Sequence, residues 1–216
     1  MRFALLVVLA VAAVHAETVA ILGDSLTAGY GLDEQQAYPA LIQHELKTLA
    51  PQWNVVNAGV SGDTTAGGRR RIGWLLKSKP EVVLIALGGN DGLRGMPVTE
   101  TIANLTAMID AIRAAGATPL LAGMQLPTNY GDDYRTAFAR AFPAVAESTK
   151  TALLPFLLDG VAADRSLNQA DGIHPNAEGQ RRVAKLVLAF LKPHLGLPLE
   201  KAVEPPSRQN VKEKQP

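Results

Sequence analysis

Four short segments of the sequence carry residue types that can activate a hydroxyl for nucleophilic attack. Ser25 follows a glycine at the end of an apolar run, and His174 follows Asp171 by three residues in a loop punctuated by glycine and proline. At that spacing a carboxylate reaches the Nδ1 side of the imidazole, so Nε2 is directed outward as a general base. The other two segments supply Gly62 and Asn90, a backbone N–H and a side-chain amide of the kind that stabilises an oxyanion.

This combination predicts a site for nucleophilic acyl transfer. Ser25 attacks a carbonyl, His174 accepts the serine proton, and Asp171 fixes the tautomer of the imidazole. The predicted oxyanion donors are the N–H groups of Ser25 and Gly62 and the amide of Asn90. A structural alternative, in which Asp171 and His174 only cap the last helix, remains open from that segment alone. The Gly-x-Ser-x-Gly elbow of α/β-hydrolases is absent.

Neighbouring residues have two interpretations each. Asp24 lies beside the predicted nucleophile and is a candidate for substrate contact. Like Asp63 and Asp91, however, it stands where an aspartate caps a helix or ties a loop, and that role is favoured over acid chemistry. Leu126 and Pro127 are candidates for lining an acyl channel, or equally for strand core.

Two other classes of protein remain as alternatives. A metallohydrolase would bind its metal through Asp24, Asp91, Asp171 and His174. That interpretation leaves Ser25 without a role, and we expect neither a metal nor a cofactor. A binding module for acyl chains or glycans is the non-enzymatic alternative, because one scaffold hosts unrelated functions. His44 and His194 lie in or beside helical patterns, where surface or core-edge roles are the default.

The spacing of the strand-like and helical patterns predicts an α/β fold. Strand-like runs occupy residues 18–22, 54–59, 81–89, 118–126 and 151–156. Amphipathic stripes between and after them predict helices around 102–112, 134–145 and 183–191, the first with Thr99 as its cap and Gly116 as its stop. We therefore expect a three-layer α/β/α domain with a five-stranded parallel sheet in flavodoxin-like order. The loops carrying Ser25, Gly62 and Asn90 would then share one edge of the sheet.

Composition narrows the class of protein further. The chain has 216 residues, of which 47% are hydrophobic and 19% charged, with a formal net charge of +1. These values are typical of one globular domain, and without a basic stripe we expect no nucleic-acid partner. The sequence contains no cysteine, which excludes a thiol nucleophile and disulfide bonds.

The two ends of the sequence differ from the part between them. Arg2, an apolar run over 3–14 and a loosely fitting cleavage site at 14–16 predict a secretory signal over residues 1–16. We therefore expect export, to the periplasm or beyond, with a domain over 17–195. From residue 196 the chain becomes a polar tail that we predict to be disordered. A monomer is the expected oligomeric state.

Four sequence blocks, in order, resemble those of the SGNH (GDSL) hydrolases. They are Gly23-Asp-Ser-Leu26, Gly62 within Ser-Gly-Asp-Thr, Gly89-Asn-Asp91 and Asp171-Gly-Ile-His-Pro175. The chain is most similar to the secreted branch of thioesterase I, arylesterase and lysophospholipase. Support for that branch comes from the stretches over 87–95 and 126–131.

The resemblance implies a specific set of roles. Ser25, Asp171 and His174 would be the catalytic triad, and Ser25, Gly62 and Asn90 the oxyanion hole. It also implies a metal-free hydrolase of esters and thioesters, with a mobile loop over 126–134 that shapes the acyl pocket. Aryl or short- to medium-chain esters and lysophospholipids are the expected substrates, and acetyl groups on polysaccharides are an alternative.

Overall fold

A single five-stranded parallel sheet forms the centre of the molecule. The computed structural model describes residues 16–198. The strand order is β2-β1-β3-β4-β5, the flavodoxin-like order predicted from the sequence, and every pairing is parallel. The strands are β1 (Glu17–Gly23), β2 (Trp53–Gly59), β3 (Val82–Ala86), β4 (Thr118–Ala122) and β5 (Ala152–Leu154).

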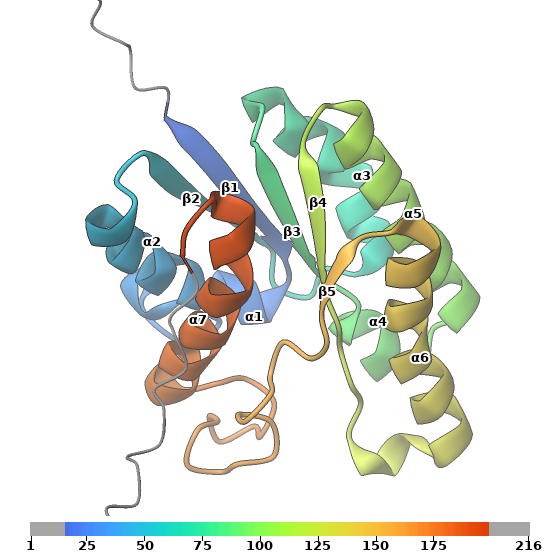
Figure 1. The fold of residues 1–216 in the computed structure, drawn as a ribbon. Helices are drawn as coiled ribbons and strands as arrows, with labels where there is room; N and C mark the ends of the chain where they lie inside the picture. The colour runs from blue at the N-terminus through green and yellow to red at the C-terminus, as the bar shows by residue number, and fades with distance from the viewer. Residues whose placement is uncertain (1–15, 199–216) are drawn as a thin grey trace, which may run out of the picture.

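Helices cover both faces of the sheet and make the predicted three layers (Figure 1). On one face lie the short α1 (Ser25–Ala28) and the longer α2 (Tyr38–Leu49) and α7 (Ala177–Leu191). On the other face lie α3 (Thr65–Leu75), α5 (Val98–Ala114) and α6 (Asp132–Thr149). The short α4 (Gly89–Leu93) follows β3 directly. Two of the long helices, α2 and α3, had not been assigned individually from the sequence.

The central strands are apolar because they are covered on both sides. Every residue of β3 is buried, and the four residues of β1 from Val19 to Leu22 are fully buried. Parallel strands with two covered faces need continuous apolar sequence rather than alternation. In the register, Gly23 at the end of β1 pairs with Gly59 of β2 and with Ala86 of β3. The loops after these three strands therefore leave from one edge of the sheet.

Several predicted boundaries were wrong. The third strand ends at Ala86 instead of Gly89, because Gly88 adopts a φ of 120° and Gly89 begins α4. The fourth and fifth strands are also shorter than predicted; after β4, Gly123 packs so closely on the Pro155 carbonyl that a Cβ there would lie 2.2 Å from its oxygen. Helix α5 begins at Val98 after Pro97, so Thr99 lies inside the first turn and is not the cap.

The described part of the chain ends shortly after α7. The 3₁₀ helix η4 (Lys192–Leu195) follows α7 and ends at Gly196, which has a φ of 68°. The predicted signal segment, apart from Ala16, and the tail beyond Pro198 lie outside the described residues. Within residues 16–198, no helix is both long enough and apolar enough to span a bilayer.

Candidate active site

Ser25 lies on a tight turn at the end of the central strand β1. The Asp24 side chain caps α1 by accepting a hydrogen bond from the Leu26 N–H at 3.0 Å. The turn is packed against the strand ends so closely that a Cβ at Gly23 would lie 1.9 Å from Oγ1 of Thr27. Glycine is therefore required there, and the serine hydroxyl is held at the sheet edge where α/β folds bind ligands.

His174 meets Ser25 from the loop that precedes α7. Its Nε2 lies 2.9 Å from Oγ of Ser25, and its Nδ1 lies 2.7 Å from Oδ2 of Asp171. The other oxygen of Asp171 accepts the N–H groups of Ile173, at 2.9 Å, and of His174, at 3.0 Å. With Nδ1–H donating to the carboxylate, Nε2 is free to accept a proton from the hydroxyl.

The same contacts keep the Asp171 carboxyl ionised. Hydrogen bonds from the N–H and the imidazole of His174, together with the Ile173 N–H, lower the pKa of Asp171 to about 2.

The imidazole of His174 also packs against the ring of Tyr30, whose centroid lies 4.7 Å away at an interplanar angle of 41°. Tyr30 was not recognised in the sequence, where an aromatic residue after a turn gives no signal.

Gly62 reaches the site from the loop after β2, and Asn90 reaches it from the first turn of α4, which follows β3. Gly62 has a φ of 78°, and within residues 16–198 its N–H donates to no other group. The carbonyl of Gly62 accepts a hydrogen bond from Nη2 of Arg94 at 2.9 Å. Nδ2 of Asn90 donates to Oδ2 of Asp24 at 3.3 Å, which leaves its second amide hydrogen for another acceptor.

A buried polar network joins α3, which follows the loop of Gly62, to α4 and α5. Thr65, at the start of α3, donates its N–H, at 2.8 Å, and its hydroxyl to the carboxylate of Asp91 in α4. Nδ2 of Asn104 in α5 donates to Oγ1 of Thr65 at 3.2 Å, and Nη1 of Arg69 donates to Oδ1 of Asn104 at 3.3 Å. The network ties three helices together directly behind the site.

The three aspartates assigned to caps and loop ties have such roles here. Asp24 caps α1, Asp91 accepts from the start of α3, and Asp63 forms a salt bridge with Arg71 at 2.7 Å. Asp24 is also 1% exposed, and this burial raises its pKa to about 6 although the Leu26 N–H and the Asn90 amide act in the opposite direction. It differs in this respect from the exposed Asp171.

A cavity of about 560 Å³ opens at Ser25. Asp24, Ser25, Gly62, Asn90 and His174 all line it, so the structure brings these predicted residues together. Much of the remaining wall is apolar and includes Leu93, Met124, Leu126, Pro127, Phe156 and Ile173.

Several residues considered in the sequence analysis do not line this cavity. His44 and His194 do not line it, and His44 is exposed. Within residues 16–198, no group of three or more histidine, aspartate or glutamate side chains could hold a metal ion. Arg94, Thr65 and Asn104 were missed, because their contacts depend on helices that only the fold brings together.

Comparison with known proteins identifies the family. Residues 21–182 match the model of the GDSL-like lipase/acylhydrolase family, well over half of the chain. The chain belongs to this family. As a GDSL-family member it is a hydrolase, in agreement with the predicted resemblance.

Named relatives and a solved structure are similar over nearly their full length. Esterase TesA of Pseudomonas aeruginosa is 49% identical over 181 residues, which cover 83% of this chain and 90% of that protein. Thioesterase 1/protease 1/lysophospholipase L1 of Escherichia coli is 41% identical over 192 residues, covering 88% and 91%. A crystal structure of TesA has a TM-score of 0.79 and 48% identity, with 82% of this chain and 99% of that one covered.

Proposed function

We propose that this GDSL hydrolase cleaves carboxylic esters and thioesters through an acyl-enzyme on Ser25. The observation that carries the proposal is the continuous line of contacts from Asp171 through His174 to the serine hydroxyl, which ends in a largely apolar cavity. A nucleophile within hydrogen-bond reach of a base, with the base oriented by a third group, is the arrangement that covalent catalysis requires.

Each group has one task in this mechanism. Oγ of Ser25 forms a bond to the carbonyl carbon while its proton passes to Nε2 of His174, and the carbonyl π electrons move onto the oxygen. The N–H groups of Ser25 and Gly62 and the amide of Asn90 stabilise that oxyanion. His174 then gives the proton to the leaving alkoxide or thiolate, and the bond to the leaving group breaks. Water then attacks the carbonyl carbon of the acyl-enzyme while His174 accepts its proton. His174 returns that proton to Oγ of Ser25 as the bond between Oγ and the acyl group breaks, and the carboxylic acid departs.

The apolar wall of the cavity supports an acyl chain as the bound part of the substrate. We infer that Leu126 and Pro127 contact the acyl chain of the substrate, since both line the cavity that opens at Ser25. Asp24 lines the cavity too, but its carboxylate already binds Leu26 and Asn90, so we infer that it acts by orienting the Asn90 amide. The names of the relatives, esterase and thioesterase 1/lysophospholipase L1, favour esters, thioesters and lysophospholipids as substrates. The preference for aryl and short- to medium-chain esters is carried over from the sequence-based prediction.

Export remains part of the proposal and rests on the sequence. The predicted signal segment precedes the first strand, which begins at Glu17. N-terminal sequencing of protein recovered from the periplasm or medium should give a start at or near Glu17. An exported chain that retains Arg2 would contradict signal cleavage.

A burst experiment tests the chemical proposal directly. With an activated aryl ester such as p-nitrophenyl butyrate, the purified chain should release one equivalent of aryl alcohol per site before steady turnover begins. Ser25→Ala should lower turnover on the order of 10⁶-fold, as removal of a triad nucleophile does elsewhere. A folded Ser25→Ala variant that retained a tenth of the activity would refute the assignment.

The same assay separates the rival classes. Activity that persists in chelator and is lost with a phosphonate directed at serine supports the serine mechanism over a metallohydrolase. A protein that binds acyl chains without ever acylating would be a binding module. A profile across acyl lengths and head groups, including lysophospholipids and acetylated polysaccharide, then identifies the preferred substrate.

A further inference from the structure

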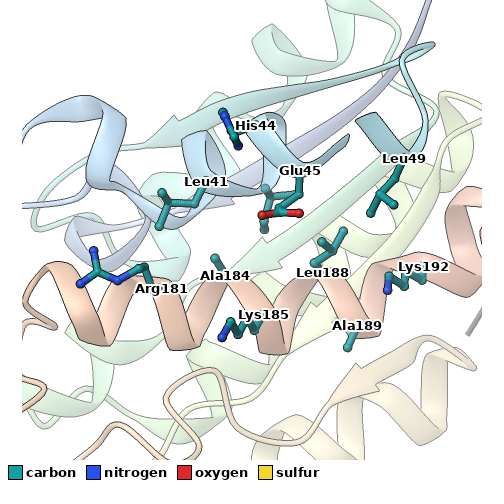
Figure 2. A pocket seen from close by; sticks show the side chains of 11 residues that line it. Leu41, His44, Glu45, Leu49, Arg181, Ala184, Lys185, Leu188, Ala189 and Lys192 are labelled. Atoms are coloured by element: carbon teal, nitrogen blue, oxygen red, sulfur yellow. The ribbon is translucent and has the colours of Figure 1, made fainter. Parts of the chain in front are cut away.

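A second concave surface lies between α2 and α7, remote from the catalytic cavity. It has a volume of about 740 Å³ and shares no lining residue with the cavity at Ser25. Its wall is largely apolar, with Leu41, Ile42 and Leu49 from α2 and Ala184, Leu188 and Ala189 from α7 (Figure 2). Leu49 is 51% exposed at the edge of this apolar wall.

The α7 edge of this groove is basic. Arg181 and Lys185 of α7 line it, as does the largely buried Lys192 at the start of η4, while α2 contributes His44 and Glu45 (Figure 2). Arg181 is held by an ion pair with Glu178 at 2.7 Å, yet its side chain is still 55% exposed. An occupant of this groove should therefore carry apolar side chains together with carboxylates.

The chain itself returns to the groove after α7. Gly196 takes the left-handed conformation, and the Leu197 N–H donates to the Lys192 carbonyl at 2.9 Å, which closes a reversing turn. Leu197 packs on the hydrophobic core, and in Figure 1 the last coloured segment turns back from the end of α7 toward α2. The described chain therefore ends close to Lys192, which lines one end of the groove.

The sequence that follows has the side chains that this groove requires. Residues 199–204 read Leu-Glu-Lys-Ala-Val-Glu, with apolar Leu199 and Val203 four positions apart, and are followed by two prolines. Glu200 and Glu204 have the charge opposite to that of the basic edge of α7, and Lys201 has the charge opposite to that of Glu45. From Lys192 to Arg181 the helix rises about 16 Å, and six extended residues reach about 20 Å, so this segment is long enough.

We propose that residues 199–204 bind in the groove between α2 and α7 of the same chain. The segment would cover Leu49 and link α2 to α7, whose first turn directly follows the loop of His174. The predicted disorder of the tail would then begin only after these residues.

Introduced cysteines test the location, because the natural sequence contains none. In the variant Leu49→Cys with Lys201→Cys, mild oxidation should form a disulfide within the monomer. The matched control is Trp74→Cys with Lys201→Cys, since Trp74 is 75% exposed on α3, on the opposite face of the sheet. We expect the first pair to close on the order of tenfold faster, because docking raises the local concentration of one thiol near the other. Equal rates would overturn the proposal, and disulfides only between two molecules would assign the groove to a second copy.

Charge reversal provides an independent measurement. Lys185→Glu and Glu204→Lys should each increase amide hydrogen exchange in α2 and α7, and the double variant should restore protection. Lys77→Glu, on an exposed residue after α3, is the matched control and should change nothing. Deletion of residues 199–216 should raise exchange in the same two helices and leave ester hydrolysis intact. Unchanged exchange in the deleted chain would contradict the docking, whatever the outcome for the proposed esterase activity.

Discussion

The two sides of Ser25, the proposed nucleophile, are built differently. On the base side, Asp171 and His174 are three residues apart in one loop, and Asp171 is exposed. On the oxyanion side, Asp91 is buried, and it is joined to Thr65 across 26 positions of the sequence. The base is thus oriented by a local contact, and the oxyanion loops are supported by long-range contacts beneath the surface.

This difference determines whether a mutation changes activity alone or activity and stability together. A local pair at the surface can be altered without disturbing the core, because its partners are solvated and its backbone is held by its own turn. A buried carboxylate that binds two donors cannot be altered in this way, since each lost partner leaves a polar group unpaired. Mutations on the base side should therefore change activity alone, while those on the oxyanion side should change activity and stability together.

Asp171→Asn gives the largest expected effect within this comparison. The amide cannot hold the imidazole in the required tautomer, so we expect kcat to fall on the order of 10³- to 10⁴-fold. The melting temperature should stay within a few degrees of wild type. Steady-state kinetics and calorimetry measure the two quantities, and a variant that melts far earlier would show that the base side is structural as well.

Asn90→Ala should have the next largest effect. Loss of one oxyanion donor slows acylation about a hundredfold or more. The rate of the burst phase reports acylation directly, and circular dichroism serves as the control for folding. If the burst rate is unchanged in a folded variant, Asn90 is not a donor.

Thr65→Val tests the buried support with a side chain of similar shape. The substitution removes the hydroxyl that donates to Asp91 and leaves the Thr65 N–H in place. We expect it to destabilise the fold by about 1–3 kcal/mol, since Asn104 also loses its acceptor, and to lower kcat more than it changes KM. Thr99→Val, on an exposed residue in the first turn of α5, is the matched control. Full stability in Thr65→Val would mean that the two sides do not differ as described.

Asp24→Asn tests the oxyanion side through the pH dependence of stability. Because burial raises the pKa of Asp24 to about 6 in the folded state, the folded chain binds this proton more tightly than the unfolded chain does. The resulting stability is complete below about pH 4 and is lost as the pH rises through about 6. A shift of this size corresponds to on the order of 3 kcal/mol.

The asparagine variant should therefore lose less stability than wild type between pH 4 and pH 7. Urea unfolding at both pH values measures the difference. Asp132→Asn is the control for the removal of one acidic side chain, because that carboxylate is exposed. Identical pH slopes for wild type and Asp24→Asn would show that the Asp24 carboxyl is not perturbed as described.

The difference between local and long-range contacts also explains which features could be predicted from the sequence. The apolar strands and the spacing of Asp171 and His174 follow from patterns within single segments, and the order of the sheet follows from the alternation of strands and helices along the chain. The partners of Asp91 lie on α3 and α5, where Thr65 and Asn104 look like ordinary helix residues until the helices pack. Strand ends were misplaced for a related reason, since the φ of Gly88 and the close packing of Gly123 are set by neighbours in space.

Ile173 stands between the orienting carboxylate and the base, yet its side chain contributes nothing to either task. It is 43% exposed on the wall of the cavity, and only its backbone N–H is needed by Asp171. Selectivity for different esters can therefore be redesigned at this one position, by evolution or in the laboratory, while the proton-transfer apparatus on either side of it stays untouched.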